Sequence, residues 1–353
     1  MKGRNYQMIL AGDIGGTKTN LGIFKQENDK VISIIKKKYE SQQYDSLENL
    51  LNEFLDLVNQ AQLSEDEKQI GVACFGIAGP VEKSPDGKRY CQMTNLNWPV
   101  IKETSVSRLI KGMSVSLLND MEAIGYGISQ LGKEDLVVIN QGKPQEGNRA
   151  IIAAGTGLGI VKLFWKDGEY YPSSSEAGHA NFAPSYDKDN LQGQLLAHLQ
   201  EKIQGDVGTE QILSGDGLVN IYEFLKGNGK YGKESAALRE RMNQKDAAQV
   251  ISEAALAHED ALCEKALDLF VSIYGSVAGN LALHDKTVGG VYIGGGIAPK
   301  ILDKMGDDTF MRFFTAKEMK FPKFAQFNAD IPVHVITNTE VGLLGAAWYA
   351  AKS

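Results

Sequence analysis

Short apolar runs alternate with glycine-rich bends and amphipathic stretches, which predicts a layered α/β fold. Met8–Ala11 and Leu21–Phe24 are apolar and flank a Gly/Thr-rich bend, so they predict a β-hairpin. Val31–Tyr39 continues as a strand, and residues 46–60 repeat apolar side chains at helical spacing. The nearly unbroken apolar run Ile70–Ile77 is typical of a strand buried on both faces.

The rest of the chain continues this alternation. A second apolar strand runs into a Gly/Thr bend and returns at Ile160–Val161, which is what an internally duplicated fold would show. Residues 246–283 are mostly helical in pattern. The other predicted elements are strands at Val115–Leu118, Ile151–Ala154 and Gly289–Ile293 and helices at Met121–Leu131 and Glu340–Ala351.

Length and composition indicate a globular chain of two domains. With 353 residues, 43% of them hydrophobic, the chain can bury a large core. We expect a small α/β domain over residues 1–122, with the terminal helix 338–353 packing back onto it. Residues 123–337 are then expected to form a larger α/β domain.

Charge and cysteine content limit the partners and the cellular compartment that we expect. A net charge of −7 and the absence of a Lys/Arg-rich block argue against a nucleic-acid partner. Cys74, Cys91 and Cys263 are odd in number and widely spaced, so they support no disulfide framework or Cys-x-x-Cys metal site. The first apolar run is too short for a signal peptide, and no run reaches the length of a membrane span. A cytoplasmic protein without a membrane partner is therefore expected.

The bend of the first hairpin carries candidate phosphate chemistry. Gly15 and Gly16 would let backbone N–H groups approach an anion, Thr17 can donate a hydroxyl, and Asp13 could hold a metal directly or through water. Residues 12–19 nearly match a P-loop, but Thr17 replaces its last glycine and strand-like residues follow where a helix is required. A glycine-rich hairpin without a ligand is the remaining alternative.

The later glycine turns offer a second candidate phosphate site and a nucleotide site. Gly155 and Thr156 follow a strand, but the chain returns into another strand, unlike a Rossmann loop, which opens a helix. Gly294, Gly295 and Gly296 follow a buried strand, where they permit close approach of a flat ligand such as adenine, or merely a tight crossover.

Polar residues follow the strands of the amino-terminal half. Asn119 and Asp120 end an apolar strand, where open α/β sheets place their chemistry, although Asp120 could instead cap the next helix. Asn95 stands between Thr94 and Trp98, a segment that either lines a cleft or forms a turn closed by a buried tryptophan.

A third polar group lies in a loop rich in glycine and serine. Glu176 and His179 have the Glu-x-x-His spacing of a di-iron helix bundle, but no second copy is present and Gly178 disfavours a helix. His179 could be a structural histidine or part of a ligand site. Glu210, on spacing alone, reads as an ordinary exposed carboxylate.

Taken in order, these segments resemble the bacterial-type ATP-dependent glucokinases, which are related to hexokinases within the sugar kinase, Hsp70 and actin superfamily. The resemblance spans nearly the whole chain. It rests on Asp13-Ile-Gly-Gly-Thr17, Thr94-Asn95, Asn119-Asp120, Gly155-Thr-Gly157 with Glu176-Ala-Gly-His179, and Gly294-Gly-Gly296.

The resemblance implies an actin-like, ribonuclease H-like fold of two α/β domains with the active site in the cleft between them. It implies ATP- and Mg²⁺-dependent phosphorylation of glucose to glucose 6-phosphate, with Asp120 as the base, and a homodimer. The sugar hydroxyls would be bound by Asn95, Asn119, Asp120, Glu176, His179 and Glu210. The nucleotide would be bound by Asp13, which also holds Mg²⁺, Gly15, Gly16, Thr17, Gly155, Thr156 and Gly294, Gly295 and Gly296.

The chain departs from related groups in two ways. Related sugar kinases and repressors carry a Cys-rich zinc motif after their Glu-x-Gly-His, but no cysteine lies between Cys91 and Cys263, so we expect no zinc at His179. We also expect no amino-terminal DNA-binding domain, because the first strand begins by Met8. The alternatives to a glucokinase are an N-acetylhexosamine kinase and a non-catalytic sugar-sensing relative.

Overall fold

The computed structural model describes residues 8–64, 69–317 and 319–353. These residues form two compact units. Unit 1 consists of the described residues of Met1–Gly132, Tyr171–Ser174 and Asn338–Ser353, and unit 2 of those of Lys133–Tyr170 and Ser175–Thr337. The domain division at residues 122 and 338 stays a prediction about independently folding parts.

Unit 1 is built on a five-stranded sheet with the order β3-β2-β1-β4-β8, in which the hairpin β1–β2 is antiparallel and β1, β4 and β8 are parallel. Its strands are β1 (Met8–Ile14), β2 (Lys18–Glu27), β3 (Lys30–Glu40), β4 (Ile70–Ile77) and β8 (Ser114–Asn119). A small sheet joins β5 (Val81–Lys83), β6 (Arg89–Cys91) and β7 (Ile101–Lys102). The helices are η1 (Ser41–Gln43), α1 (Leu47–Gln60), α3 (Glu103–Leu109), α4 (Asp120–Gly127), η2 (Ile128–Gln130) and α13 (Val341–Lys352).

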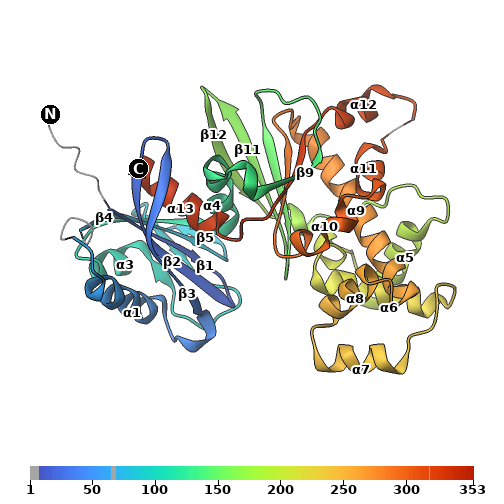
Figure 1. Ribbon diagram of the computed structural model, residues 1–353, viewed down its shortest axis with the longest axis horizontal. Helices are drawn as coiled ribbons and strands as arrows, with labels where there is room; N and C mark the ends of the chain where they lie inside the picture. Colours follow the sequence, from blue (N-terminus) through green and yellow to red (C-terminus); the bar gives the residue numbers. More distant parts are fainter. Residues whose placement is uncertain (1–7, 65–68, 318) are drawn as a thin grey trace. The chain divides into compact units, whose positions relative to one another are not determined.

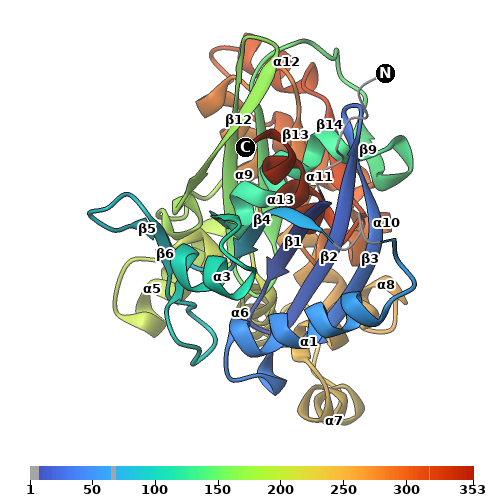
Figure 2. The same cartoon turned by 90° about the vertical axis from the view of Figure 1, so that its left-hand side faces the viewer.

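Successive side chains of a strand point to opposite faces of the sheet. One face of this sheet packs against α1 and the other against α13. Leu10 of β1 packs in one cluster with Phe54 of α1, whereas its neighbour Ala11 packs in another with Leu343 of α13. Figure 2 shows β1, β2 and β3 side by side with α1 across them. The predicted strands Val31–Tyr39 and Ile70–Ile77 are confirmed as β3 and β4.

The backbones of the terminal helix α13 and of α4 approach each other closely. A Cβ at Gly345 would lie 1.7 Å from the carbonyl oxygen of Ala123, and a Cβ at Gly127 would lie 2.0 Å from that of Val341. Only glycine allows such an approach. These glycines therefore hold the carboxyl-terminal helix against the helix that begins at Asp120.

Unit 2 is built on a six-stranded sheet with the order β12-β11-β10-β13-β14-β9. The strands of this sheet are β9 (Leu136–Asn140), β10 (Arg149–Ala154), β11 (Leu158–Lys166), β12 (Glu169–Ser175), β13 (Val291–Gly294) and β14 (Val333–Ile336). Of the edge strand β12, Tyr171–Ser174 is grouped with unit 1. The α-helices are α5 (Leu191–Ile203), α6 (Gly215–Asn228), α7 (Ala236–Gln244), α8 (Ala247–Leu256), α9 (Ala261–Asp285), α10 (Leu302–Met305), α11 (Asp308–Thr315) and α12 (Lys323–Ala329). Short 3₁₀ turns are η3 (Lys133–Asp135), η4 (Ala177–His179), η5 (Thr209–Gln211) and η6 (Ala298–Ile301).

The long helix α9 forms the centre of the unit 2 core, with α11 packed along it (Figure 1). Its Tyr274 hydroxyl is fully buried and donates to the carbonyl of Ile152 on β10, 3.3 Å away. Contrary to our expectation from the sequence, α9 is long and apolar enough to cross a membrane by length and composition. However, 78% of that stretch is buried inside the protein, as expected of a core helix.

Candidate active site

The first predicted phosphate site is a hairpin turn in unit 1. Asp13 on β1 lies opposite Asn20 on β2, and the N–H of Gly15 donates to the carbonyl of Lys18 at 3.0 Å. A Cβ at Gly15 would lie 2.9 Å from that carbonyl oxygen, so the turn requires a glycine. Because the strand β2 begins at Lys18, where a P-loop requires a helix, the hairpin prediction is confirmed and the P-loop is excluded.

Ser41 stabilises this turn by hydrogen bonds, and no local sequence pattern predicted its role. Its hydroxyl donates to the carbonyl of Gly15 at 2.8 Å and lies 2.9 Å from the hydroxyl of Thr19. Its backbone N–H donates to the carbonyl of Thr17 at 2.9 Å. Ser41 and Thr19 are both fully buried, whereas Thr17 is exposed at the tip. The buried hydroxyls hold the backbone of the turn, and Thr17 remains accessible to a ligand.

Asp13 and Asp120 form a pair of carboxyl groups at the carboxyl ends of β1 and β8. The pKa of Asp13 is raised from an ordinary 3.8 to about 6, first because burial removes solvent from its carboxylate and second because of the negative charge of Asp120. A hydrogen bond from the Asn20 side chain opposes this rise. A carboxylate whose pKa is raised by burial and by a neighbouring acidic residue is typical of a cation site or an acid–base site.

Asn119 and Asp120 also organise the start of α4. The Asn119 side-chain oxygen accepts from the N–H of Met121 at 3.0 Å, and its amide donates to the carbonyl of Gly79 at 3.1 Å. Asn119 is therefore the N-cap, and Asp120 is the first residue of the helix, with one oxygen accepting from the same N–H at 2.9 Å. The sequence left open whether Asp120 caps this helix or takes part in the chemistry. The structure shows that Asn119, not Asp120, is the cap.

Asn95 lies against the first hairpin. A Cβ at Gly16 would lie 2.9 Å from the Cβ of Asn95, so the glycine makes room for this exposed side chain. Trp98 is buried, and its indole N–H donates to the carbonyl of Tyr44 at 2.6 Å. The turn closed by a buried tryptophan is therefore confirmed, and Asn95 is exposed beside the first hairpin. That Asn95 lines a cleft stays a prediction.

The second hairpin lies in unit 2 and is held by Glu210. Gly155 follows β10, and its N–H donates to the carbonyl of Gly157 at 2.8 Å. Glu210 accepts from the N–H of Leu158 at 2.8 Å, and a Cβ at Gly157 would lie 2.7 Å from the same carboxylate oxygen. Glu210 is therefore an anchored, partly buried carboxylate beside this turn, not the ordinary exposed group that spacing alone suggested.

The glycine turn after β13 lies beside the second hairpin. Gly295 has φ +81°, and a Cβ there would lie 2.2 Å from the carbonyl oxygen of Ala154, so this position requires glycine. Gly296 is different, because a Cβ there meets no described atom within 4 Å. A Cβ at Gly155 would lie 3.9 Å from the backbone nitrogen of Gly296, which brings the two predicted nucleotide segments together within unit 2.

Glu176 precedes the short turn η4, which ends at His179, and both side chains are exposed. The Glu176 carboxylate lies 4.0 Å from Nε2 of His179. A Cβ at Gly178 would lie 2.1 Å from the carbonyl oxygen of Leu158, so the glycine of Glu-Ala-Gly-His lets this turn pack against β11. The N–H of Thr209 donates to the carbonyl of Ala180 at 2.9 Å, which places η4 next to the turn that bears Glu210.

Two carboxylates and one imidazole therefore lie in the same region of unit 2, those of Glu176, Glu210 and His179. Across the described residues, no cluster of three or more His, Cys, Asp or Glu side chains is arranged to hold a metal ion. These three side chains can instead donate to or accept from hydroxyl groups.

Comparison with known proteins identifies the family. A family model described as Glucokinase matches residues 10–353. A glucokinase from Nostoc sp. is 40% identical over 98% of this chain and 99% of its own length. A glucokinase structure from an Antarctic psychrotroph covers 99% of this chain and 100% of its own, at 27% identity and a TM-score of 0.80. A glucokinase from Balamuthia mandrillaris, solved with glucose, shares the fold at 22% identity and a TM-score of 0.74.

The match to the family model extends over nearly the whole chain, and the relatives are aligned over almost their full lengths. The fold is the mixed α/β, actin-like fold of the sugar kinases, as the sequence predicted. The chain therefore belongs to the glucokinase family, the enzymes that phosphorylate glucose.

Proposed function

We propose that the chain transfers the terminal phosphoryl group of ATP to the 6-hydroxyl of glucose, with Asp120 as the base. The observation that carries this proposal is the pair Asp13 and Asp120 at the carboxyl ends of strands of one sheet. One carboxylate suits a cation and the other suits a hydroxyl. Phosphoryl transfer needs both, and little other chemistry from the protein.

Asp120 orients the sugar hydroxyl and takes its proton as the oxygen bonds to phosphorus and the bond to ADP breaks. Its position at the first residue of α4, supported by the Asn119 cap, fixes the direction of its carboxylate. Rigid placement matters because alignment of the attacking hydroxyl supplies much of the rate enhancement.

Asp13 fits a divalent cation, directly or through water. Burial and the charge of Asp120 make its carboxylate costly to ionise alone, and a cation would relieve both effects. Mg²⁺ commonly binds through one or two carboxylates together with substrate phosphates, whose charge it neutralises. Asn20 would keep the Asp13 carboxylate oriented toward that cation.

The remaining residues divide between phosphate, adenosine and sugar. The backbone of Gly15, Gly16, Gly155 and the hydroxyls of Thr17 and Thr156 would bind phosphates, and Gly294, Gly295 and Gly296 would lie near adenosine. Asn95, Asn119, Glu176, His179 and Glu210 would bind sugar hydroxyls. Asn119 retains one N–H and one oxygen lone pair beyond its two protein hydrogen bonds.

We further propose a cytoplasmic, glycolytic role and a homodimer, both by likeness to the family. The three cysteines are free and buried, as suits a reducing compartment. Among related activities, the family and its relatives favour glucose over an N-acetylated hexosamine.

The test is a coupled assay of sugar phosphate formation with ATP and Mg²⁺. Glucose is compared with mannose, fructose, N-acetylglucosamine and N-acetylmannosamine. A strong preference for glucose is expected. Turnover of an N-acetylated sugar alone would move the assignment to the N-acetylhexosamine kinases, and binding of glucose without turnover would point to a sugar sensor.

A further inference from the structure

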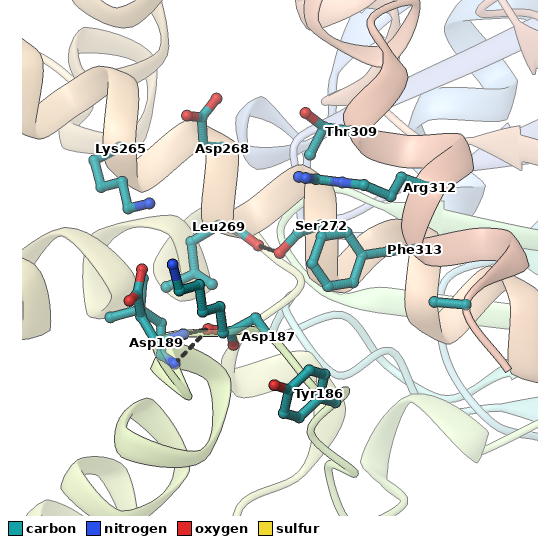
Figure 3. Close-up of a pocket in the computed structure, with 13 residues that line it drawn as sticks. Tyr186, Asp187, Asp189, Lys265, Asp268, Leu269, Ser272, Thr309, Arg312 and Phe313 are labelled. Carbon is teal, nitrogen blue, oxygen red and sulfur yellow. Dashed lines mark hydrogen bonds between the residues drawn. The ribbon is translucent and has the colours of Figure 1, made fainter. Parts of the chain in front are cut away.

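A cavity in unit 2 involves none of the residues assigned to catalysis. It has a volume of about 400 Å³ and lies between the loop that precedes α5 and the helices α9 and α11 (Figure 3). This volume is in the range of sites for small molecules. None of its lining residues belongs to the glycine turns, to η4 or to η5.

Basic side chains line this cavity from three elements. Lys265 projects from α9 and Arg312 from α11, and both reach toward the space between the helices in Figure 3. Lys188 adds a third cation from the loop. Within the described residues, Lys265 and Arg312 contact aromatic rings instead of carboxylates: Lys265 lies 5.5 Å from the Tyr231 ring centroid and Arg312 lies 5.1 Å from that of Phe313.

Two of the three carboxylates that line the cavity are already used by other groups. Asp187 accepts hydrogen bonds from the backbone N–H groups of Asp189, Leu191 and Gln192, at 3.1, 2.9 and 3.2 Å. Asp268 is paired with Lys304, which also contacts Asp307 at 2.7 Å. The wall therefore offers cationic donors to a ligand, together with the exposed carboxylate of Asp189.

The loop is tied to the helix behind it by buried polar contacts. The hydroxyls of Ser185 and Ser276 lie 2.7 Å apart, and Gln192 bridges the N–H of Ser185, at 2.8 Å, and the hydroxyl of Ser272, at 3.2 Å. Gln192 is fully buried. The cavity is thus formed by an anchored loop, so its cations are held on a fixed frame.

We propose that this cavity is a second ligand site, which binds a phosphorylated sugar. Lys265 and Arg312 hold the phosphate, because charge-assisted hydrogen bonds from ammonium and guanidinium groups are the strong ones for phosphate oxygens. Asp189 accepts hydrogen bonds from sugar hydroxyls. The ring of Phe313 packs against the carbon face of the sugar.

The test is titration calorimetry of the full chain with ribose 5-phosphate as the probe, in the presence of saturating glucose and β,γ-imido-ATP. These ligands fill the proposed active site, so heat reports binding elsewhere. Inorganic phosphate and ribose are titrated separately. The variants are Arg312→Gln and Lys265→Gln, with Lys323→Gln as the matched control, because Lys323 lies over the Phe324 ring at 5.2 Å but outside the cavity.

We expect ribose 5-phosphate to bind with a dissociation constant below about 1 mM. Arg312→Gln and Lys265→Gln should each weaken it by about tenfold or more, whereas Lys323→Gln leaves it unchanged. No binding to the unmodified chain, or equal binding to all variants, would overturn the proposal. Inorganic phosphate binding as tightly as ribose 5-phosphate would refute the sugar part. Lys265 and Arg312 line the cavity and lie outside the proposed active site, so the effects of their variants do not depend on whether the proposed kinase function is right.

Discussion

Replacing Asp13 by asparagine should stabilise the unliganded protein at neutral pH while it removes activity. Partial burial and the negative charge of Asp120 raise the pKa of the Asp13 carboxylate to about 6. An ionised Asp13 therefore opposes folding, and an isosteric amide does not carry that charge. Catalytic groups commonly lower stability in this way.

The magnitude follows from the pKa. A rise from 3.8 to about 6, at about 1.4 kcal/mol for each pKa unit, corresponds to about 3 kcal/mol at most. Because Asp13 retains some exposure, we expect about 2 kcal/mol. The folded protein holds the proton more tightly than the unfolded chain, so the free energy of unfolding falls as pH rises from about 4 to about 6. At pH 4.5 the free energies of unfolding of Asp13→Asn and the unmodified protein should differ by only about a third of their difference at pH 8.

The assay is urea denaturation of the Asp13→Asn variant and the unmodified protein at pH 4.5 and pH 8, without ligands. Asp56→Asn, on the exposed face of α1, is the control for losing one negative charge. Added Mg²⁺ should stabilise the unmodified protein more than Asp13→Asn. A variant that is less stable than the unmodified protein at pH 8, or a difference independent of pH, would refute the reasoning.

Two glycines test the structure of the site further. A Cβ at Gly296 meets no described atom within 4 Å, so Gly296→Ala should leave the melting temperature unchanged and raise the KM for ATP several-fold; an unchanged KM would remove this turn from the nucleotide site. A Cβ at Gly178 would lie 2.1 Å from a carbonyl oxygen, so Gly178→Ala should lower the free energy of unfolding by about 2 kcal/mol and raise the KM for glucose. Gly227→Ala, where a Cβ meets nothing within 4 Å, is the matched control, and equal stability of the two variants would contradict the packing of η4.

The hydrophobic pattern of a short segment was enough to predict the hairpins and the terminal helix. The hairpins β1–β2 and β10–β11 follow from apolar runs around Gly/Thr bends. The terminal helix, expected from Glu340, begins at Val341. Conversely, the helical stretch 246–283 is two helices, because His258 adopts φ 55° and Asp260 caps α9 through the N–H groups of Leu262 and Cys263.

The pairing of strands that are far apart in the chain could not be predicted from the sequence. The short strand β9 completes the edge of the unit 2 sheet only by pairing with β14, as in Asn140 opposite Val333. The candidate site showed the same limit. The residue types at Asp13 and Asp120 could be read from the chain, but the buried bonds of Ser41 and the anchoring of Glu210 on the second hairpin depend on tertiary contacts.

The most direct test of the account is the turnover of Asp120→Asn. Glucose 6-phosphate formation is measured with ATP and Mg²⁺, and glucose binding is measured by calorimetry on the same preparation. With Asp120 as the base, kcat should fall by on the order of 10²-fold or more while glucose affinity is largely retained. Turnover close to that of the unmodified protein would show that Asp120 is not the base.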